Sequence, residues 1–172
     1  MDTSKFDQLA HEGCSYVFDF MVGEKAVFVS DSHLIGAGAS GTNLFGSMNG
    51  LDVGFYSISV GYVGDAEGMI ILILTRALAE RFTCKLLDMP SIEWTGTEDP
   101  RETMQDTMGE LGNSFVGLVK GALTKIYPRL KLTTPQVNRG SLIPVNSAEY
   151  SFRKQYHFTA MGSSMIVDIC HK

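Results

Sequence analysis

The sequence predicts an α+β fold, in which helices pack on a mostly antiparallel β-sheet, and three observations support this class. First, the apolar residues of 99–128 recur at helical spacing. Second, residues 52–63 alternate with period two and turn directly into the apolar run 69–74, as an antiparallel hairpin does. Third, residues 149–160 and 165–170 are a second pair of strand-like segments joined by a short turn.

The length and composition fit one domain with a substantial core. The chain has 172 residues, of which 44% are hydrophobic. We therefore expect a single domain over residues 1–172. It should consist of an N-terminal helix at about 3–22, a glycine-rich loop region at 23–50, and a core of sheet and helices at 52–170.

The charge and the apolar runs exclude several classes of partner. The net charge of −5 offers no basic patch for nucleic acid or an anionic membrane. The longest apolar run is far too short to span a bilayer, and the first residues lack the features of a secretory signal. The scattered cysteines Cys14, Cys84 and Cys170 are typical of reduced thiols. We expect a cytoplasmic protein that binds neither nucleic acid nor membrane.

The first elements have clear boundary signals. Asp2 or Thr3 can cap the N-terminal helix, and Gly23 can end it. Residues 26–30 are a short strand candidate.

The elements on either side of the long helix have weaker signals. Thr75 can cap a helix over residues 76–87. After the long helix, residues 130–134 are a strand candidate and residues 135–147 have the composition of a loop.

The glycine-rich region contains a literal G-x-G-x-x-G, from Gly36 to Gly41. A dinucleotide site would need a helix that opens at the third glycine. Residues 42–50 are instead broken by glycine and end in an Asn-Gly turn signal, which favours a loop. This segment could be a regulatory insertion or could cover a neighbouring surface. A nucleotide-dependent enzyme is an alternative that binding of a dinucleotide would reveal.

The long helix has sequence signals for both of its ends. Asp99 is a suitable N-cap, Pro100 suits the first helical position, and Glu102 completes a capping box. Pro128 forbids continuation at the other end. We therefore expect helix from residue 99 to the vicinity of residue 127.

One face of this helix is apolar and the opposite face is polar. Asp106, Glu110, Asn113 and Gly117 fall in a narrow arc opposite the apolar stripe, and we call these four residues the polar ridge. The apolar stripe comprises Met108, Leu111, Phe115, Leu118, Val119, Ala122 and Ile126. Glycines inside a helix each cost about 0.8–1 kcal/mol relative to alanine. One interpretation is a solvated face with packing glycines, and the other is a surface that a second molecule approaches closely.

The polar ridge resembles the signature helix of the CheC/CheX/FliY family, which dephosphorylates the chemotaxis response regulator CheY. The shared pattern is D-x-x-x-E-x-x-N-x-x-x-G, and the CheX-like branch, with one such helix per chain, is the most similar. The likeness extends to residues 61–72, 132–140 and 152–169, which resemble that family's flanking hairpins, strand and loop. It implies a CheC/CheX-like antiparallel sheet with packed helices, and a homodimer.

The resemblance also implies a mechanism and a partner. The substrate would be a phosphorylated CheY-like response regulator that itself carries Mg²⁺, so this chain would need no cofactor of its own. Asn113 would orient the attacking water, and Glu110 would bind the regulator's active-site lysine. Gly117 would permit close approach, and Asp106 would be a contact at the rim of the interface.

A second hypothesis is a non-catalytic module of the same fold. Such a module would dock to a regulator, or to a motor or signalling partner, through Glu110. The helix over residues 76–87 carries Glu80 and Thr83 at the same spacing as the catalytic pair. Because Thr stands in place of Asn there, we expect no second site on that helix.

Overall fold

The computed structural model describes residues 4–33, 54–92, 100–140, 145 and 147–172. The helices are α1 (Ser4–Val22), α2 (Arg76–Leu86), α3 (Pro100–Leu123) and a short 3-10 turn, η2 (Ser147–Glu149). The strands are β1 (Val27–His33), β2 (Phe55–Val63), β3 (Gly68–Thr75), β4 (Lys131–Leu132), β5 (Gln136–Arg139), β6 (Phe152–Ala160) and β7 (Ser163–His171). The proposed cap Asp99 and the glycine-rich motif 36–41 lie outside the described residues.

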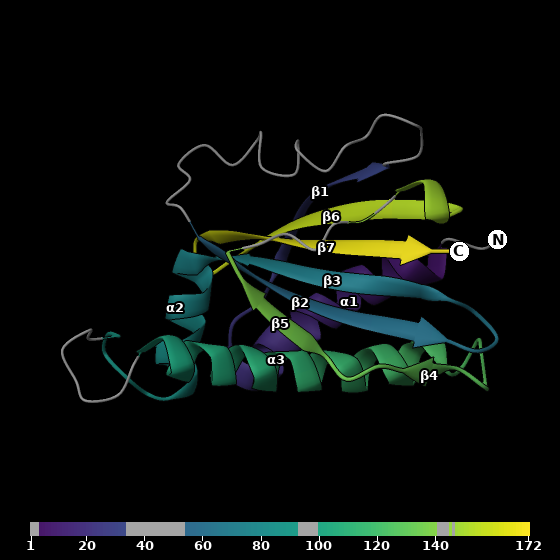
Figure 1. Cartoon of the computed structure of the whole chain (residues 1–172). Helices are drawn as coiled ribbons and strands as arrows, with labels where there is room; N and C mark the ends of the chain where they lie inside the picture. The colour runs from purple at the N-terminus through teal and green to yellow at the C-terminus, as the bar shows by residue number, and fades with distance from the viewer. Residues whose placement is uncertain (1–3, 34–53, 93–99, 141–144, 146) are drawn as a thin grey trace.

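The described strands form one antiparallel sheet, which confirms the predicted α+β class. Its order is β1-β6-β7-β3-β2-β4, and β5 also pairs with β2. Both predicted hairpins are present, with Ile58 opposite Leu72 and Tyr156 opposite Val167. Figure 1 shows α3 running along one side of the sheet, α1 behind the sheet, and α2 at one end.

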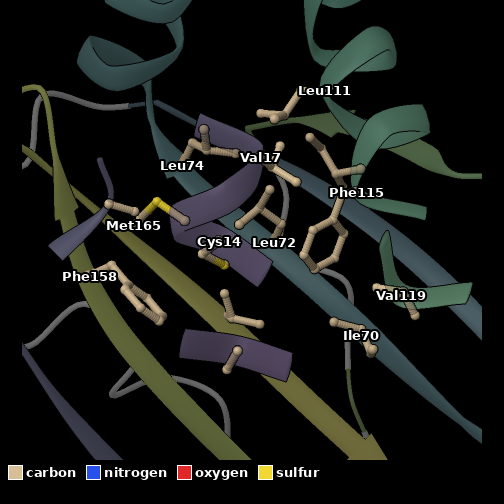
Figure 2. Packing of buried hydrophobic residues seen from close by; sticks show 14 of the residues in the cluster. Cys14, Val17, Ile70, Leu72, Leu74, Leu111, Phe115, Val119, Phe158 and Met165 are labelled. Atoms are coloured by element: carbon tan, nitrogen blue, oxygen red, sulfur yellow. The ribbon is translucent and has the colours of Figure 1, made fainter. Parts of the chain in front are cut away.

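The main core lies between the sheet and the helices. Val17 of α1, Leu72 of β3, and Phe115 and Val119 of α3 are all buried in one cluster (Figure 2). Side chains that alternate with these along β3 point to the opposite face of the sheet, where Ile71 and Ile73 form a second, smaller cluster. A strand buried on both faces explains why residues 69–74 are continuously apolar.

The predicted caps of the first two helices are confirmed where the structure describes them. The Thr75 hydroxyl accepts a hydrogen bond from the Leu78 amide at 3.3 Å, as an N-cap does. Gly23 ends α1 with φ of +67°, a conformation that favours glycine, and its amide donates to the Asp19 carbonyl.

The end of α3 and the segment 136–139 differ from the prediction. The helix ends at Leu123 rather than near residue 127, because the Ile126 amide turns back to the Leu123 carbonyl in a tighter final turn. Residues 136–139, predicted as loop, form β5. The sequence of this strand shows no alternation of apolar and polar residues. It is a strand because its backbone pairs with β2.

A buried ion pair links β6 and β7 on the sheet face away from the helices. Arg153 and Asp168 have only 3% and 1% of their side chains exposed, and Arg153 Nη2 lies 2.7 Å from Asp168 Oδ2. Gln155 Nε2 donates to the same carboxylate at 2.9 Å. A buried carboxylate with several donors is satisfied, but either charge alone would be costly to bury.

A second polar tie fastens α1 to the sheet. Lys154 Nζ on β6 lies 2.7 Å from Asp7 Oδ1 on α1 and 2.9 Å from Asp31 Oδ2 on β1. The Tyr156 hydroxyl donates to the same Asp7 oxygen at 2.7 Å. Burial works to raise the pKa of the Asp7 carboxyl, but the hydrogen bonds from Lys154 and Tyr156 and the Lys154 charge outweigh it, so that the pKa is lowered.

Asp168→Asn should destabilise the protein by about 3–5 kcal/mol, because it removes the carboxylate charge that lies 2.7 Å from the buried Arg153 guanidinium. The free energy of unfolding in urea measures this. Glu80→Gln is the matched control, since it breaks the more exposed Arg76–Glu80 pair and should cost only about 0.3–0.5 kcal/mol. Similar losses for the two variants would show that the buried pair is unimportant.

Asp7→Asn should make stability less sensitive to acid. Because folding lowers the Asp7 pKa, the stabilisation from this carboxylate is complete above the unfolded-state value of about 3.9 and is lost as pH falls through the lower folded-state pKa. Urea midpoints of the wild type and the variant should therefore converge as the pH falls from 5 to 2, roughly the range over which a carboxylate titrates. A constant difference across that range would contradict the assignment.

Candidate functional site

All four residues of the polar ridge lie on the exposed face of α3. The buried face of the same helix carries Met108, Leu111, Phe115 and Val119. From Asp106 to Gly117 the ridge extends about 16 Å, at 1.5 Å per residue. Glu110 and Asn113 are three residues apart, so their side chains are neighbours on the helix surface. The spacing predicted from the sequence therefore produces one continuous exposed row.

The ridge is held between two supports. On one side Gly112 packs on the sheet, where an added Cβ would lie 2.9 Å from Ile58 Cγ2 and 3.2 Å from Pro135 Cβ. The Gln105 side chain donates to the Val137 carbonyl of β5 at 3.1 Å, which fastens the same side. A positioned helix, unlike a loop, holds its side chains in a defined geometry before any partner arrives.

The other support is α1. Gly13 of α1 faces Leu118 of α3, and an added Cβ on Gly13 would lie 2.7 Å from Leu118 Cδ2. Glycine at this position lets the two helices approach closely. Leu118, expected in the core stripe, is only partly buried, because it also lines the hollow between α1 and α3.

The acid and the amide of the ridge have no partner within the described part of the chain. Neither Glu110 nor Asn113 makes a hydrogen bond or an ion pair there. Both side chains are exposed, so binding a second molecule would not first require breaking a contact with the described part of the chain. The pair can offer a carboxylate to a cation and a neutral amide to a water or a phosphoryl oxygen.

The glycines of α3 serve two different purposes. Gly112 is a packing glycine, which agrees with one of the two interpretations of the sequence. Around Gly109, Gly117 and Gly121, by contrast, an added Cβ would meet nothing within 4 Å. Packing therefore does not explain these three, although each weakens the helix. Gly117 leaves the backbone of the ridge open to close approach.

The neighbouring helix α2 offers no equivalent ridge. Glu80 is paired with Arg76 at 2.7 Å, and Thr83 is fully buried. The pattern Glu-x-x-Thr therefore lies partly on the core face of that helix. Thr83 is therefore not presented on the surface of α2 as Asn113 is on α3.

Other candidate ligands are used for packing. His11 contacts the rings of Phe28 and Tyr156, and His171 lies 3.0 Å from the Tyr62 hydroxyl, where burial lowers its pKa. Among the residues that the structure describes, no group of three or more His, Cys, Asp or Glu side chains could hold a metal ion. None of the described helices is long and apolar enough to cross a membrane.

One surface feature of α1 was not predicted from the sequence. Tyr16 and Phe20 of α1 are 61% and 72% exposed, and their rings stack at 5.9 Å with an interplanar angle of 9°. At 100° per residue, Phe20 falls on the same side of α1 as the buried Leu9 and Gly13, and Tyr16 lies at the edge of that side. Their spacing of four residues was the available signal for a surface pair.

Comparison with known proteins identifies the family. Residues 56–159 match the model of the chemotaxis phosphatase CheX, and this match includes the whole polar ridge. Comparison with curated proteins gives no match.

Solved structures share the fold at low sequence identity. A CheC-like superfamily protein from Shewanella sp. PV-4 superposes with a TM-score of 0.73 at 19% identity, over 100% of this chain and 99% of that chain. The chemotaxis protein CheX from Desulfovibrio desulfuricans gives 0.69 at 17%, over 99% and 98%. The CheX chain in the CheX–CheY–BeF3–Mg²⁺ complex from Borrelia burgdorferi gives 0.66 at 18%, over 94% of each.

The family match covers well over half of the chain, and these neighbours share its arrangement of helices on an antiparallel sheet. The resemblance noted in the sequence is thereby confirmed, and the chain belongs to the CheX family of chemotaxis phosphatases.

Proposed function

We propose that this protein hydrolyses the aspartyl phosphate of a CheY-type response regulator in chemotaxis or a related two-component pathway. The observation that carries the proposal is the exposed pair of Glu110 and Asn113 on a firmly packed helix, where neither side chain has a partner among the described residues. Membership of the CheX family supports it. So does the Borrelia burgdorferi structure, in which a CheX of the same fold was crystallised with CheY.

Asn113 is the proposed catalytic residue. Hydrolysis of an acyl phosphate requires a water in line with the leaving carboxylate, and most of the rate enhancement comes from positioning and electrostatics. An amide can hold this water without adding negative charge beside the phosphoryl group. We assign Mg²⁺ to the regulator, where it would neutralise the phosphoryl oxygens, and no cofactor to this chain.

Glu110 is the proposed anchor of the ridge in the regulator's pocket. Its carboxylate would pair with the lysine of that pocket, and the three-residue spacing lets Asn113 enter the same pocket from one helix face. The open backbone at Gly117 would permit close contact, and Asp106 would contact the rim. The homodimer implied by the family resemblance stays a prediction.

The alternative function is a docking module without catalysis. The ridge is acidic at Asp106 and Glu110, and the whole chain carries a net charge of −5. Long-range electrostatics would therefore not accelerate encounter with an anionic phosphorylation site. Binding alone would not need the amide of Asn113, so substitution of this residue separates the two functions.

Asn113→Ala should reduce the rate constant for regulator dephosphorylation by about a hundredfold, because the water is no longer held in line. The measurement is decay of an acetyl-phosphate-labelled regulator under single-turnover conditions. Asn113 is exposed, so the free energy of unfolding should stay within about 0.5 kcal/mol of the wild type. Unchanged decay in the variant would overturn the catalytic assignment, and binding without any wild-type decay would favour the docking module.

Gly117→Gln should stabilise the free protein and weaken its action on the regulator. Removing an exposed helical glycine should add about 0.5–1 kcal/mol to the free energy of unfolding. The same side chain would block the proposed close approach and raise KM. Gly121→Gln is the matched control, one turn further along α3, with equally open space around its Cα. An equal KM for the two variants would contradict the role given to Gly117.

A further inference from the structure

Helix α1 runs antiparallel to α3 along one flank of the polar ridge. Phe6, near the start of α1, and Tyr127, just after α3, both contact the ring of His171, with ring centroids 5.3 Å and 6.3 Å away. The start of α1 is therefore beside the end of α3. Further along, Gly13 meets Leu118, which fixes the relative position of the two helices.

This arrangement places Tyr16 and Phe20 alongside α3. Both fall in the arc of α1 that contains Gly13 and therefore faces α3. Tyr16 lines a hollow between the two helices together with Leu118, and the Phe20 ring stacks on the Tyr16 ring. Because α1 runs antiparallel to α3, Phe20 lies about one turn nearer to Asn113 than Tyr16 does.

The two aromatic side chains are not needed to close the core. Phe20 is 72% exposed and Tyr16 61%, whereas the neighbouring Val17 and Phe18 are almost fully buried. Single exposed apolar residues are ordinary on protein surfaces. A stacked aromatic pair beside a row of polar groups is the composition of a binding hot spot, in which rigid rings supply most of the affinity.

The charge of the protein gives a reason for an apolar anchor at this place. Asp106 and Glu110 make the ridge acidic, and an aspartyl phosphate is itself an anion, so the general electrostatics oppose association. The specific pair between Glu110 and a lysine would offset only part of this. Burial of apolar area beside the ridge is a source of affinity that like charges do not weaken.

We propose that Tyr16 and Phe20 are the apolar anchor by which this chain docks its response regulator. The inference rests on the function proposed above. The occupant is the regulator surface that borders its anionic phosphorylation pocket, and it should present apolar side chains opposite the two rings. Docking on this pair sets affinity, while Asn113 sets the rate of the bound complex.

The test is the double variant Tyr16→Ala/Phe20→Ala with CheY-type regulators of the same genome, phosphorylated by acetyl phosphate. KM should rise about tenfold or more, and kcat should stay within about twofold of the wild type. Tyr16→Phe/Phe20→Tyr keeps both rings and should keep the wild-type KM. Val29→Ala is the control for an exposed apolar residue elsewhere, because Val29 is 59% exposed on β1, at the other end of the sheet from β2 and β4.

The outcomes separate docking from catalysis. An unchanged KM in the double variant, with wild-type activity present, overturns the anchor and leaves the proposed function intact. If the wild type proves inactive, affinity for a beryllofluoride-bound regulator replaces KM, and a tenfold weaker Kd in the double variant supports the anchor without the phosphatase. Absence of wild-type binding overturns the anchor. Conversion of a dimer to a monomer with unchanged Kd also overturns it, since the pair would then serve self-association.

Discussion

The packing of α3 on the sheet is the constraint on which the rest of the site depends. Gly112 seats the helix against Ile58 and Pro135, and the buried stripe fixes its rotation about its own axis. Once that rotation is set, the residues on the opposite face of α3 point toward solvent. The exposure of Glu110 and Asn113 is thus a consequence of the core, and any change that rotates α3 would move the ridge with it.

Helix α1 completes this surface from the other side. It is held to the sheet by the contact of Lys154 with Asp7, and to α3 by the contact of Gly13 with Leu118. These ties determine where Tyr16 and Phe20 stand relative to the ridge. The polar ridge supplies the groups proposed for catalysis, and the two rings supply the apolar area proposed for docking.

The sequence predicted most of the fold and the exposed ridge, because long periodic segments report their buried faces directly. It did not predict β5, since residues 136–139 owe their strand conformation to pairing with β2. It also missed the burial of Arg153, because a charged residue is ordinarily exposed unless a distant partner such as Asp168 is known. Tyr16 and Phe20 were missed for a related reason: their position beside α3 depends on tertiary packing.

On the function proposed here, the Asn113 amide enters the regulator's phosphorylation pocket, and side-chain NMR can detect this entry. We would titrate ¹⁵N-labelled protein with a beryllofluoride-bound CheY-type regulator and follow the Asn113 side-chain NH₂ signals. These signals should shift to a new saturable position, together with the backbone amides of the polar ridge, while the signals of β1 stay unchanged. Saturable binding that leaves the Asn113 signals unchanged would contradict it.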